Sequence, residues 1–226
     1  MAIPAPAVPR TLTCRAVLFD MDGTLVDSTP VVEQVWSEFA ARYGLDSAEI
    51  LRTSHGVQAI DTVRRFAPPG ADVEVLAAEL GAMERVRTEG IVPLPGAAEL
   101  LSILPGDAVA LVTSADRALA DIRMDAAGLA MPATVVTADL ITHGKPHPEG
   151  YLRAAELLGV EPAEALVFED APAGIAAGLA AGIRTVAVGP NTGPLPNGVL
   201  HINDYSSVSA TMETDAAGSR TISFLL

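Results

Sequence analysis

The sequence predicts an α/β protein with a Rossmann-like parallel sheet core and an inserted small helical cap domain. Short apolar runs alternate with segments of helical periodicity along most of the 226 residues, as expected for consecutive βαβ units. The apolar runs lack a regular polar–apolar alternation, which is typical of strands covered by helices on both faces. About ninety residues separate the first apolar run from the second, and this length indicates an inserted module rather than a simple crossover.

The core strands are expected at apolar runs bounded by glycine, proline or polar turns, with the core helices between them. Gly128, Gly159 and Gly182 follow three of these helices, and a glycine just past a helix can adopt the left-handed conformation that ends it. The predicted strands are 16–20, 108–113, 133–136, 165–169 and 184–188, and the predicted helices are 97–104, 116–127, 148–158 and 172–181.

The inserted module begins with residues 30–43, whose apolar side chains recur at helical spacing until Gly44 ends the run. Further helices are expected at 57–66 and 72–88, and the prolines and glycine of 93–96 mark a stiff return to the core. We therefore divide the chain into a flexible N-terminal arm at 1–14, an α/β core at 15–26 and 94–210, a helical cap at 27–93 and a C-terminal tail at 211–226.

The two ends of the chain give weaker signals. Three prolines among the first ten residues predict a loose arm rather than a secretory signal. Residues 199–202 have the pattern of a final strand, 203–206 could cap a short helix, and 213–219 are small and polar as in a loop. Residues 221–226 could form an edge strand, contact a partner or be a disordered end.

Composition limits the class of partner. A net charge of −14 argues against nucleic acid, and no uninterrupted apolar stretch is long enough to span a membrane. An anionic substrate would be repelled at long range, so positive potential must be local. The single cysteine, Cys14, cannot form an internal disulfide and fits a reducing cytoplasm. We expect a cytoplasmic protein that is a monomer or a weak homodimer.

The first apolar run, 16–20, leads into Asp20-Met-Asp22-Gly-Thr, which places two carboxylates two residues apart at the carboxyl end of a strand. Two such charges repel each other unless a cation or a reaction uses them. Mg²⁺ is the natural cation, since it favours one or two carboxylates together with water and substrate phosphate. The alternative is an aspartate-rich turn that caps the helix beginning near Thr29.

Three further polar clusters follow apolar runs or lie in loops beside them. Two hydroxyls stand at the end of the apolar run 108–113, and two carboxylates stand at the end of the apolar run 165–169. Between these runs, a lysine lies in a loop that prolines and a glycine constrain. In an open α/β sheet the carboxyl ends of the strands converge on one crevice, so we expect these side chains to meet the first aspartates there. The clusters are Thr113 with Ser114, Lys145 within 143–149, and Glu169 with Asp170.

In this order the four clusters resemble the motifs of the haloacid dehalogenase superfamily, specifically its phosphatase branch with a helical cap. The resemblance covers roughly residues 15 to 205, and the combination of motifs is far more specific than any one of them. It implies a phosphoric monoester hydrolase that acts on small sugar or polyol phosphates. It also implies Mg²⁺ as cofactor, an aspartyl-phosphate intermediate and a small phosphorylated metabolite as partner.

The resemblance further implies a role for each cluster. One aspartate attacks phosphorus, and the other protonates the leaving oxygen and then activates water. The lysine and the hydroxyl cluster bind the phosphoryl group, and carboxylates with one backbone carbonyl hold the metal. The implied catalytic residues are Asp20 as nucleophile, Asp22 as acid and base, and Lys145. The implied phosphate-binding residues are Thr113, Ser114 and Lys145. The implied metal ligands are Asp20, Asp22 through its carbonyl, Glu169 directly or through water, and Asp170.

One segment of the inserted module falls where this family has its substrate-specificity loop. Residues 54–61 are similar to cap segments of deoxyhexose-phosphate and glycerol-phosphate phosphatases, so His55, Gln58 and Asp61 are candidate specificity residues. Relatives commonly carry an arginine near position 58. The glutamine at this position weakens the case for a second anionic contact.

Other functions stay open at this point. A β-phosphoglucomutase-like phosphomutase shares these motifs, although Thr24 is more typical of a phosphatase and Gln58 departs from the arginine that would hold a second phosphate. A non-catalytic module on the same fold would bind a phosphorylated metabolite, but such relatives usually lack at least one of the charged groups. A dehalogenase is disfavoured, because displacement of halide needs neither Asp22 nor the pair Glu169 and Asp170.

Overall fold

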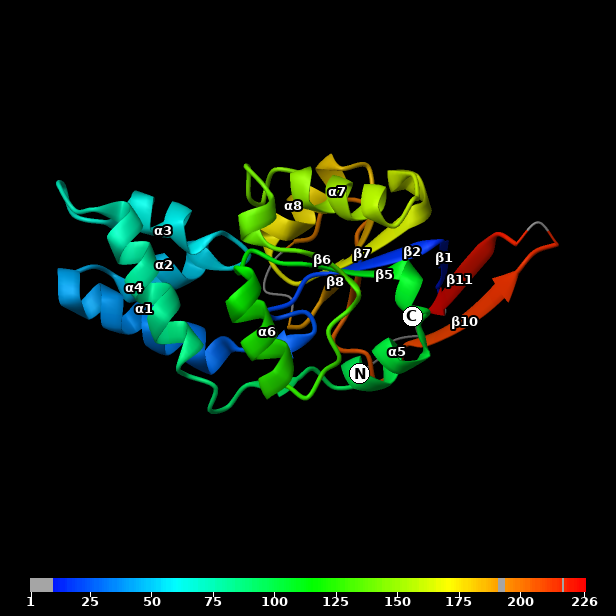
Figure 1. Cartoon of the computed structure of the whole chain (residues 1–226), viewed down its shortest axis with the longest axis horizontal. Helices are drawn as coiled ribbons and strands as arrows, with labels where there is room; N and C mark the ends of the chain where they lie inside the picture. The colour runs from blue at the N-terminus through cyan, green and yellow to red at the C-terminus, as the bar shows by residue number, and fades with distance from the viewer. Residues whose placement is uncertain (1–9, 191–193, 217) are drawn as a thin grey trace, which may run out of the picture.

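The computed structural model describes residues 10–190, 194–216 and 218–226. The central strands are β2 (Ala16–Phe19), β5 (Val109–Val112), β6 (Thr134–Val136), β7 (Ala165–Glu169), β8 (Arg184–Val188) and β9 (Leu200–Ile202). Within the described ranges they form a six-stranded sheet in the order β6-β5-β2-β7-β8-β9, and all neighbours are parallel (Figure 1). The predicted α/β fold with a parallel sheet is confirmed, and β2 lies in its interior.

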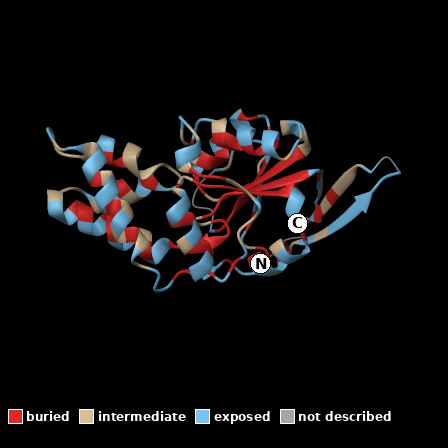
Figure 2. Ribbon diagram, in the orientation of Figure 1, coloured by how far each residue is buried: buried red, intermediate tan, exposed pale blue. Residues whose placement is uncertain are grey.

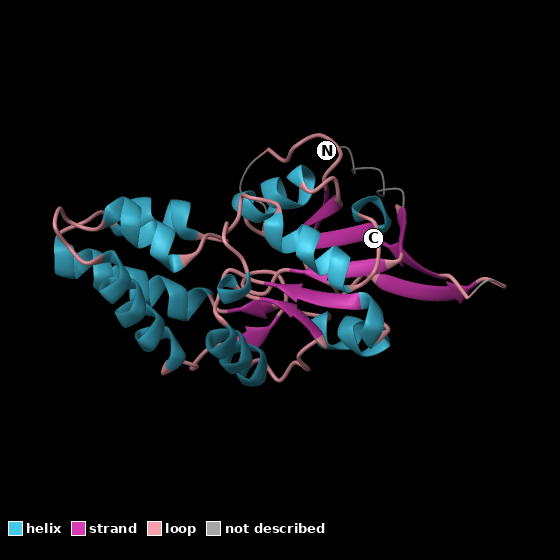
Figure 3. Cartoon of the chain, turned by 45° about the horizontal axis from the view of Figure 1, so that its top comes forward, coloured by secondary structure: helices cyan, strands magenta, loops and turns pink. Residues whose placement is uncertain are grey.

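Helices cover both faces of the sheet (Figure 3). They are α5 (Ala97–Ile103), α6 (Arg117–Ala126), α7 (Glu149–Leu157) and α8 (Pro172–Ala180), with 3-10 turns at Gly106–Ala108, Ala138–Leu140 and Pro162–Glu164. Val17 and Phe19 of β2 belong to an apolar cluster with residues of α5 and α6, whereas Leu18 belongs to a second cluster with residues of α7 and α8. The inner strands β5, β2 and β7 are therefore buried on both sides (Figure 2), as their unbroken apolar runs predicted.

A helical unit, α1 to α4, is inserted between β2 and β5 and stands beyond one end of the sheet (Figure 1). Its helices are α1 (Thr29–Tyr43), α2 (Ser47–Ser54), α3 (Ala59–Phe66) and α4 (Val73–Arg85). The short strands β3 (Val26–Asp27) and β4 (Val92–Pro93) pair antiparallel at its base, so the chain leaves and re-enters the core at one place. Among the described helices none is long and apolar enough to cross a membrane.

Helix α2 was not predicted from the sequence. It is only eight residues long, and few of its side chains are apolar. The helix begins where the carboxylate of Asp46 accepts hydrogen bonds from the backbone N–H groups of Ala48 and Glu49, at 2.9 and 3.4 Å. A cap of this kind supports a short helix that tertiary packing, rather than periodicity, selects.

Both ends of the described chain join a second sheet, which corrects three predictions. Strand β1 (Thr11–Cys14) pairs antiparallel with β11 (Arg220–Leu225), and β11 also pairs with β10 (Ser209–Thr214). Residues 11–14 are thus no flexible arm, 213–214 are no loop, and 203–206 form a bend and turn rather than the start of a helix. Pairing between opposite ends of the chain leaves no local signal in the sequence. Residues 1–9 of the predicted arm lie outside the described residues.

Phe224 anchors this second sheet to the core. Its side chain is fully buried, and its ring centroid lies 5.5 Å from that of Phe168 in β7. Phe168 in turn stacks on Phe19 of β2 at 5.1 Å, and Tyr205 meets both of these rings edge on. The last strand is therefore part of the apolar core.

Phe224→Ala should lower the free energy of unfolding by about 3–5 kcal/mol, because it removes a buried ring and leaves a cavity beside Phe168. Leu225→Ala is the matched control, since Leu225 lies next along β11 and is 45% exposed. Urea unfolding of both variants measures the difference. Equal, small losses would show that the last strand does not hold the core together.

Candidate active site

The polar clusters predicted from the sequence meet at the carboxyl edge of the sheet. Asp20 follows β2, Thr113 follows β5 and Glu169 ends β7, and these three strands are neighbours. Lys145 reaches the same edge from the loop that precedes α7 and bonds to Asp20 there. The strand order thus brings together Asp20, Lys145, Glu169 and Asp170, as expected for an open parallel sheet.

Lys145 has a buried ammonium group at the centre of this cluster. Its Nζ donates to the carboxylate of Asp20, to Glu169 Oε1 at 2.7 Å and to the backbone carbonyl of Val112 at 3.2 Å, and its side chain is only 5% exposed. Burial disfavours the charged ammonium, but the carboxylates of Asp20 and Glu169 outweigh burial and raise the pKa of Lys145 above its ordinary value. The lysine is therefore a fixed positive charge.

Glu169 is held rigidly by groups of the core. Besides the lysine, its Oε1 accepts the hydroxyl of Tyr151 at 3.2 Å, and its Oε2 accepts the backbone N–H of Ala171 at 2.8 Å. Gly174 makes room for this carboxylate, because a Cβ at that position would lie 1.5 Å from Oε1. Tyr151 was not singled out from the sequence, since a tyrosine on an amphipathic helix carries no motif.

Three carboxylates gather around this single ammonium. Oxygen atoms of Asp20, Glu169 and Asp170 all lie within 4.8 Å of one another. Burial is the main cause that raises the pKa of Asp20 to about 7, with Lys145 opposing the shift and Glu169 adding to it. Burial, followed by the charges of Glu169 and Asp20, raises the pKa of Asp170 well above its usual range. An all-oxygen set with excess negative charge fits a hard cation such as Mg²⁺.

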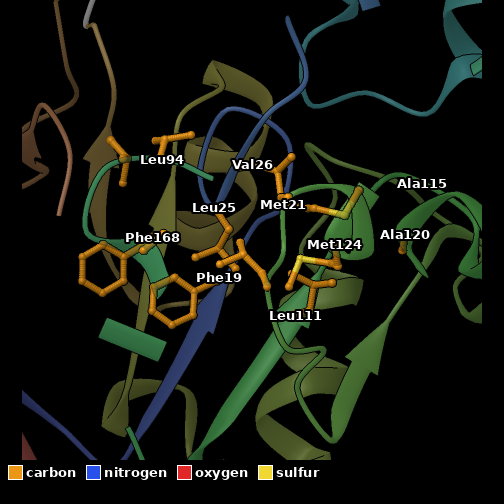
Figure 4. Packing of buried hydrophobic residues seen from close by; sticks show 14 of the residues in the cluster. Phe19, Met21, Leu25, Val26, Leu94, Leu111, Ala115, Ala120, Met124 and Phe168 are labelled. Atoms are coloured by element: carbon orange, nitrogen blue, oxygen red, sulfur yellow. The ribbon is translucent and has the colours of Figure 1, made fainter. Parts of the chain in front are cut away.

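The turn after β2 depends on Gly23. Its φ is 83°, and a Cβ there would lie 2.1 Å from Asp170 Oδ2, so only glycine lets the turn approach this carboxylate. The next residue, Thr24, donates its hydroxyl to Asp170 Oδ1 at 3.2 Å. Apolar packing holds the turn from the other side, because Met21 and Leu25 are fully buried in the core (Figure 4).

Asp22 lies beside this group, but its carboxylate is not one of the three. Its Oδ1 accepts the hydroxyl of Ser28 at 2.6 Å, and its Oδ2 accepts Nη1 of Arg123 at 2.6 Å. The side chain of Asp22 is 27% exposed, whereas that of Asp20 is 6% exposed. Arg123 and its second partner, Glu84, were not identified from the sequence, because their contacts join segments far apart in the chain.

The two residues after β5 have different partners. Thr113 Oγ1 accepts the backbone N–H of Ala115 at 3.1 Å, which fixes its side chain at the edge of the sheet. Ser114 Oγ donates to the carbonyl of Gly56 at 2.8 Å, in the segment between α2 and α3. A Cβ on Gly56 would lie 2.6 Å from Cβ of Ala171, so this segment of the helical unit lies directly on the core.

The candidate specificity residues lie near, but not in, the carboxylate cluster. Gln58 and Asp61 line a groove of about 750 Å³ between α3 and the loop before α7, whose loop side includes His143 and His147. Asp61 is paired with Arg64 at 2.5 Å. His55 is exposed and does not line this groove.

His143, His147 and Glu149 form a second group of potential metal ligands on the loop before α7. Their polar atoms already brace the loop. Glu149 accepts the backbone N–H groups of Thr142 and His143 at 2.8 and 3.0 Å, and these bonds together with the His143 side chain lower the pKa of Glu149 to about 2. We therefore assign this group to the support of the loop that carries Lys145.

Comparisons with known proteins identify relatives of this chain. A family model described as haloacid dehalogenase-like hydrolase matches residues 14–182. Over 181 residues the chain is 46% identical to hexitol phosphatase A of Escherichia coli K12, covering 78% of this chain and 84% of that protein. Over 197 residues it is 36% identical to glycerol-1-phosphate phosphohydrolase 1 of Saccharomyces cerevisiae, covering 82% of this chain and 79% of that protein.

A likeness of fold alone extends to another enzyme. The crystal structure of β-phosphoglucomutase from Clostridium difficile matches with a TM-score of 0.73 and 21% identity, covering 85% of this chain and 92% of that chain.

Gly23→Ala should displace the carboxylate of Asp170 as well as strain the backbone. Gly70→Ala is the matched control, because Gly70 has almost the same φ, 84°, and a Cβ added there would meet nothing within 4 Å. Both variants should lose about 1–2 kcal/mol of stability through the left-handed backbone. Only Gly23→Ala should also lose stabilisation by Mg²⁺ in thermal unfolding. An undiminished response to Mg²⁺ would contradict the close approach to Asp170.

The stability of the metal-free protein should fall as the pH rises. The folded pKa of Asp20 is raised from 3.8 to about 7, so the folded state keeps a proton that the unfolded chain releases. Its stabilising contribution is complete below about pH 4 and is lost as the pH approaches about 7. Because a metal ligand must be deprotonated, Mg²⁺ held by these carboxylates should raise the melting temperature more at about pH 8 than at about pH 5. An equal effect at both values would contradict this coupling.

Proposed function

The chain belongs to the haloacid dehalogenase-like hydrolases, and from this premise we propose that it hydrolyses phosphate monoesters of small sugars or polyols with Mg²⁺ as cofactor. One observation carries the proposal: the buried ammonium of Lys145 touches Asp20 and Glu169, with Asp170 alongside. This arrangement supplies both a carboxylate that can attack phosphorus and the positive charge that a phosphoryl dianion requires. The hexitol and glycerol phosphates in the names of two relatives give the substrate class.

In the first half of the proposed reaction, a carboxylate oxygen of Asp20 attacks phosphorus and the bond to the leaving oxygen breaks. Asp22, in its protonated form, gives its proton to that oxygen, so the alcohol departs neutral and an aspartyl phosphate remains. Lys145 lies within hydrogen-bonding distance of Asp20 and can stabilise charge on the transferred group. The Thr113 hydroxyl and the backbone N–H of Ser114 are proposed as further donors to the phosphoryl oxygens.

In the second half, water attacks the phosphorus of the aspartyl phosphate while Asp22, now ionised, takes one of its protons. The bond between phosphorus and Asp20 breaks, inorganic phosphate leaves and both aspartates return to their starting states. Asp20, Asp170, Glu169 and the backbone carbonyl of Asp22 would hold Mg²⁺. When bound, the ion offsets repulsion among the carboxylates and polarises the phosphoryl oxygens.

We further propose that residues 27–93 act as a cap over the site. The contact between Ser114 and Gly56 supports this role, because it joins the helical unit to the edge where phosphate would bind. Paired strands β3 and β4 at its base would serve as the hinge, and closure would exclude water during the first half-reaction. His55, Gln58 and Asp61 are proposed to contact the sugar or polyol part of the substrate.

The alternatives have less support. A phosphomutase has in its favour a likeness of fold alone. A non-catalytic module does not account for the charged groups of the site, all of which are present and gathered at one edge. We also propose a cytoplasmic location, since the lone thiol of Cys14 is buried and unpaired by any disulfide among the described residues.

Asp20→Asn should remove nearly all turnover while leaving the fold intact, because an amide can neither attack phosphorus nor bind the metal as a carboxylate does. Lys145→Ala should lose roughly 10²- to 10³-fold through loss of one electrostatic stabiliser. Release of inorganic phosphate from a hexitol phosphate, glycerol phosphate and p-nitrophenyl phosphate measures both. Asp125→Asn, on the exposed side of α6, controls for the amide substitution itself. Full activity in EDTA would overturn the mechanism.

Gln58→Ala should change the ratio of kcat/KM between a hexitol phosphate and glycerol phosphate, because Gln58 would contact the part in which these substrates differ. His55→Ala tests the exposed neighbour in the same way. Hydrolysis of p-nitrophenyl phosphate, which makes few polar contacts, should fall much less. Equal losses on all three esters would show that the segment serves closure or folding instead of recognition.

A further inference from the structure

A buried ion-paired triad joins three separate parts of the chain. Arg123, on α6, places Nη1 2.6 Å from Asp22 Oδ2 in the turn after β2, and Nη2 3.2 Å from Glu84 Oε1 on α4. The side chain of Arg123 is 5% exposed and that of Glu84 is 11% exposed. The guanidinium group of Arg123 therefore contacts Asp22, the proposed acid and base, and also the last turn of α4 in the helical unit.

Asp22 is oriented from two sides. Arg123 holds Oδ2, while the hydroxyl of Ser28 holds Oδ1 at 2.6 Å. Ser28 occupies the N-cap position of α1, yet its side chain makes no capping bond to that helix. Its hydroxyl donates a hydrogen bond to Asp22 instead. With both oxygens engaged, the carboxylate has one orientation, and both donors lie at or against the helical unit.

Stability alone does not explain Arg123. Its Nε and Nη2 have no hydrogen-bond partner among the described residues, Nη2 meeting Glu84 as an ion pair only, and leaving such groups buried costs free energy. Burial raises the pKa of Glu84, even though Arg123 opposes the shift. A buried ion pair of this kind is weak evidence for stability, because well-packed apolar side chains often serve as well or better. A role in function accounts for the burial of these charges.

We propose that Arg123 is a positioning residue for Asp22. It fixes the carboxylate that the mechanism uses as acid and base, and through Glu84 it couples that orientation to the seating of the helical unit on the core. This inference rests on the proposed function. The neighbouring ion pair between Arg85 and Asp116 also joins α4 to α6, but it does not contact Asp22 and so serves docking alone.

The test compares two leaving groups. The alkoxide of glycerol phosphate must be protonated as it departs, whereas p-nitrophenolate leaves with little help. Arg123→Met should therefore lower kcat/KM for glycerol phosphate by about 10²-fold, the order expected for a misplaced catalytic group, and for the aryl ester by much less. Glu84→Gln should shift the ratio in the same direction by a smaller factor. Arg123→Lys should recover part of the loss, because an ammonium can still bond to Asp22.

Arg85→Gln is the matched control, because it breaks the neighbouring ion pair between α4 and the start of α6. It should leave the ratio of kcat/KM for the two esters unchanged. Equal losses on both esters in Arg123→Met would overturn the positioning role, and an unchanged ratio in Glu84→Gln would overturn the coupling to the helical unit. If Arg123→Met does not fold, the ratio of kcat/KM between the two esters in Arg123→Lys and Glu84→Gln tests the proposal instead. A wild type that hydrolyses none of a hexitol phosphate, glycerol phosphate and p-nitrophenyl phosphate would overturn the proposed function itself, which separates the two failures.

Discussion

The site is built around a charge imbalance: two buried carboxylates, Asp20 and Glu169, and the half-buried carboxylate of Asp170 face one buried ammonium. Lys145 bonds to two of them, and burial, together with the neighbouring negative charges, raises the pKa values of Asp20 and Asp170. The backbone is shaped by the same crowding. Gly23 and Gly174 lie where a Cβ would occupy the space of a carboxylate. The excess negative charge favours the entry of a cation, which in turn would offset the repulsion of a phosphoryl dianion.

Much of the site could be predicted from the sequence, because a parallel sheet brings the carboxyl ends of its strands to one edge. A polar residue just after an apolar run must lie at the carboxyl edge, so Asp20, Thr113 and Asp170 could be placed near one another from their motifs. Lys145 followed from its constrained loop. The core strands and helices were predictable for a similar reason, since burial on both faces leaves unbroken apolar runs.

Other parts of the structure could not be predicted, because each lacks a local pattern in the sequence. Arg123 on α6 and Glu84 on α4 are ordinary charged residues on amphipathic helices until folding brings them to Asp22. Helix α2 depends on one capping carboxylate, Asp46, in a short polar stretch. The first and last described strands, β1 and β11, pair with each other, and single-sequence periodicity says nothing about pairing over such a distance.

That last pairing has a consequence for synthesis. Thr11 to Cys14 are synthesised about two hundred residues before their hydrogen-bonding partners, which extend to Leu225. Strand β1 must therefore remain unpaired with β11 until β11 has left the ribosome, and the second sheet closes only then. Contacts so distant in sequence form slowly. Until then Phe224 cannot cover the ring of Phe168, and apolar surface left uncovered in this way favours association of unfinished chains.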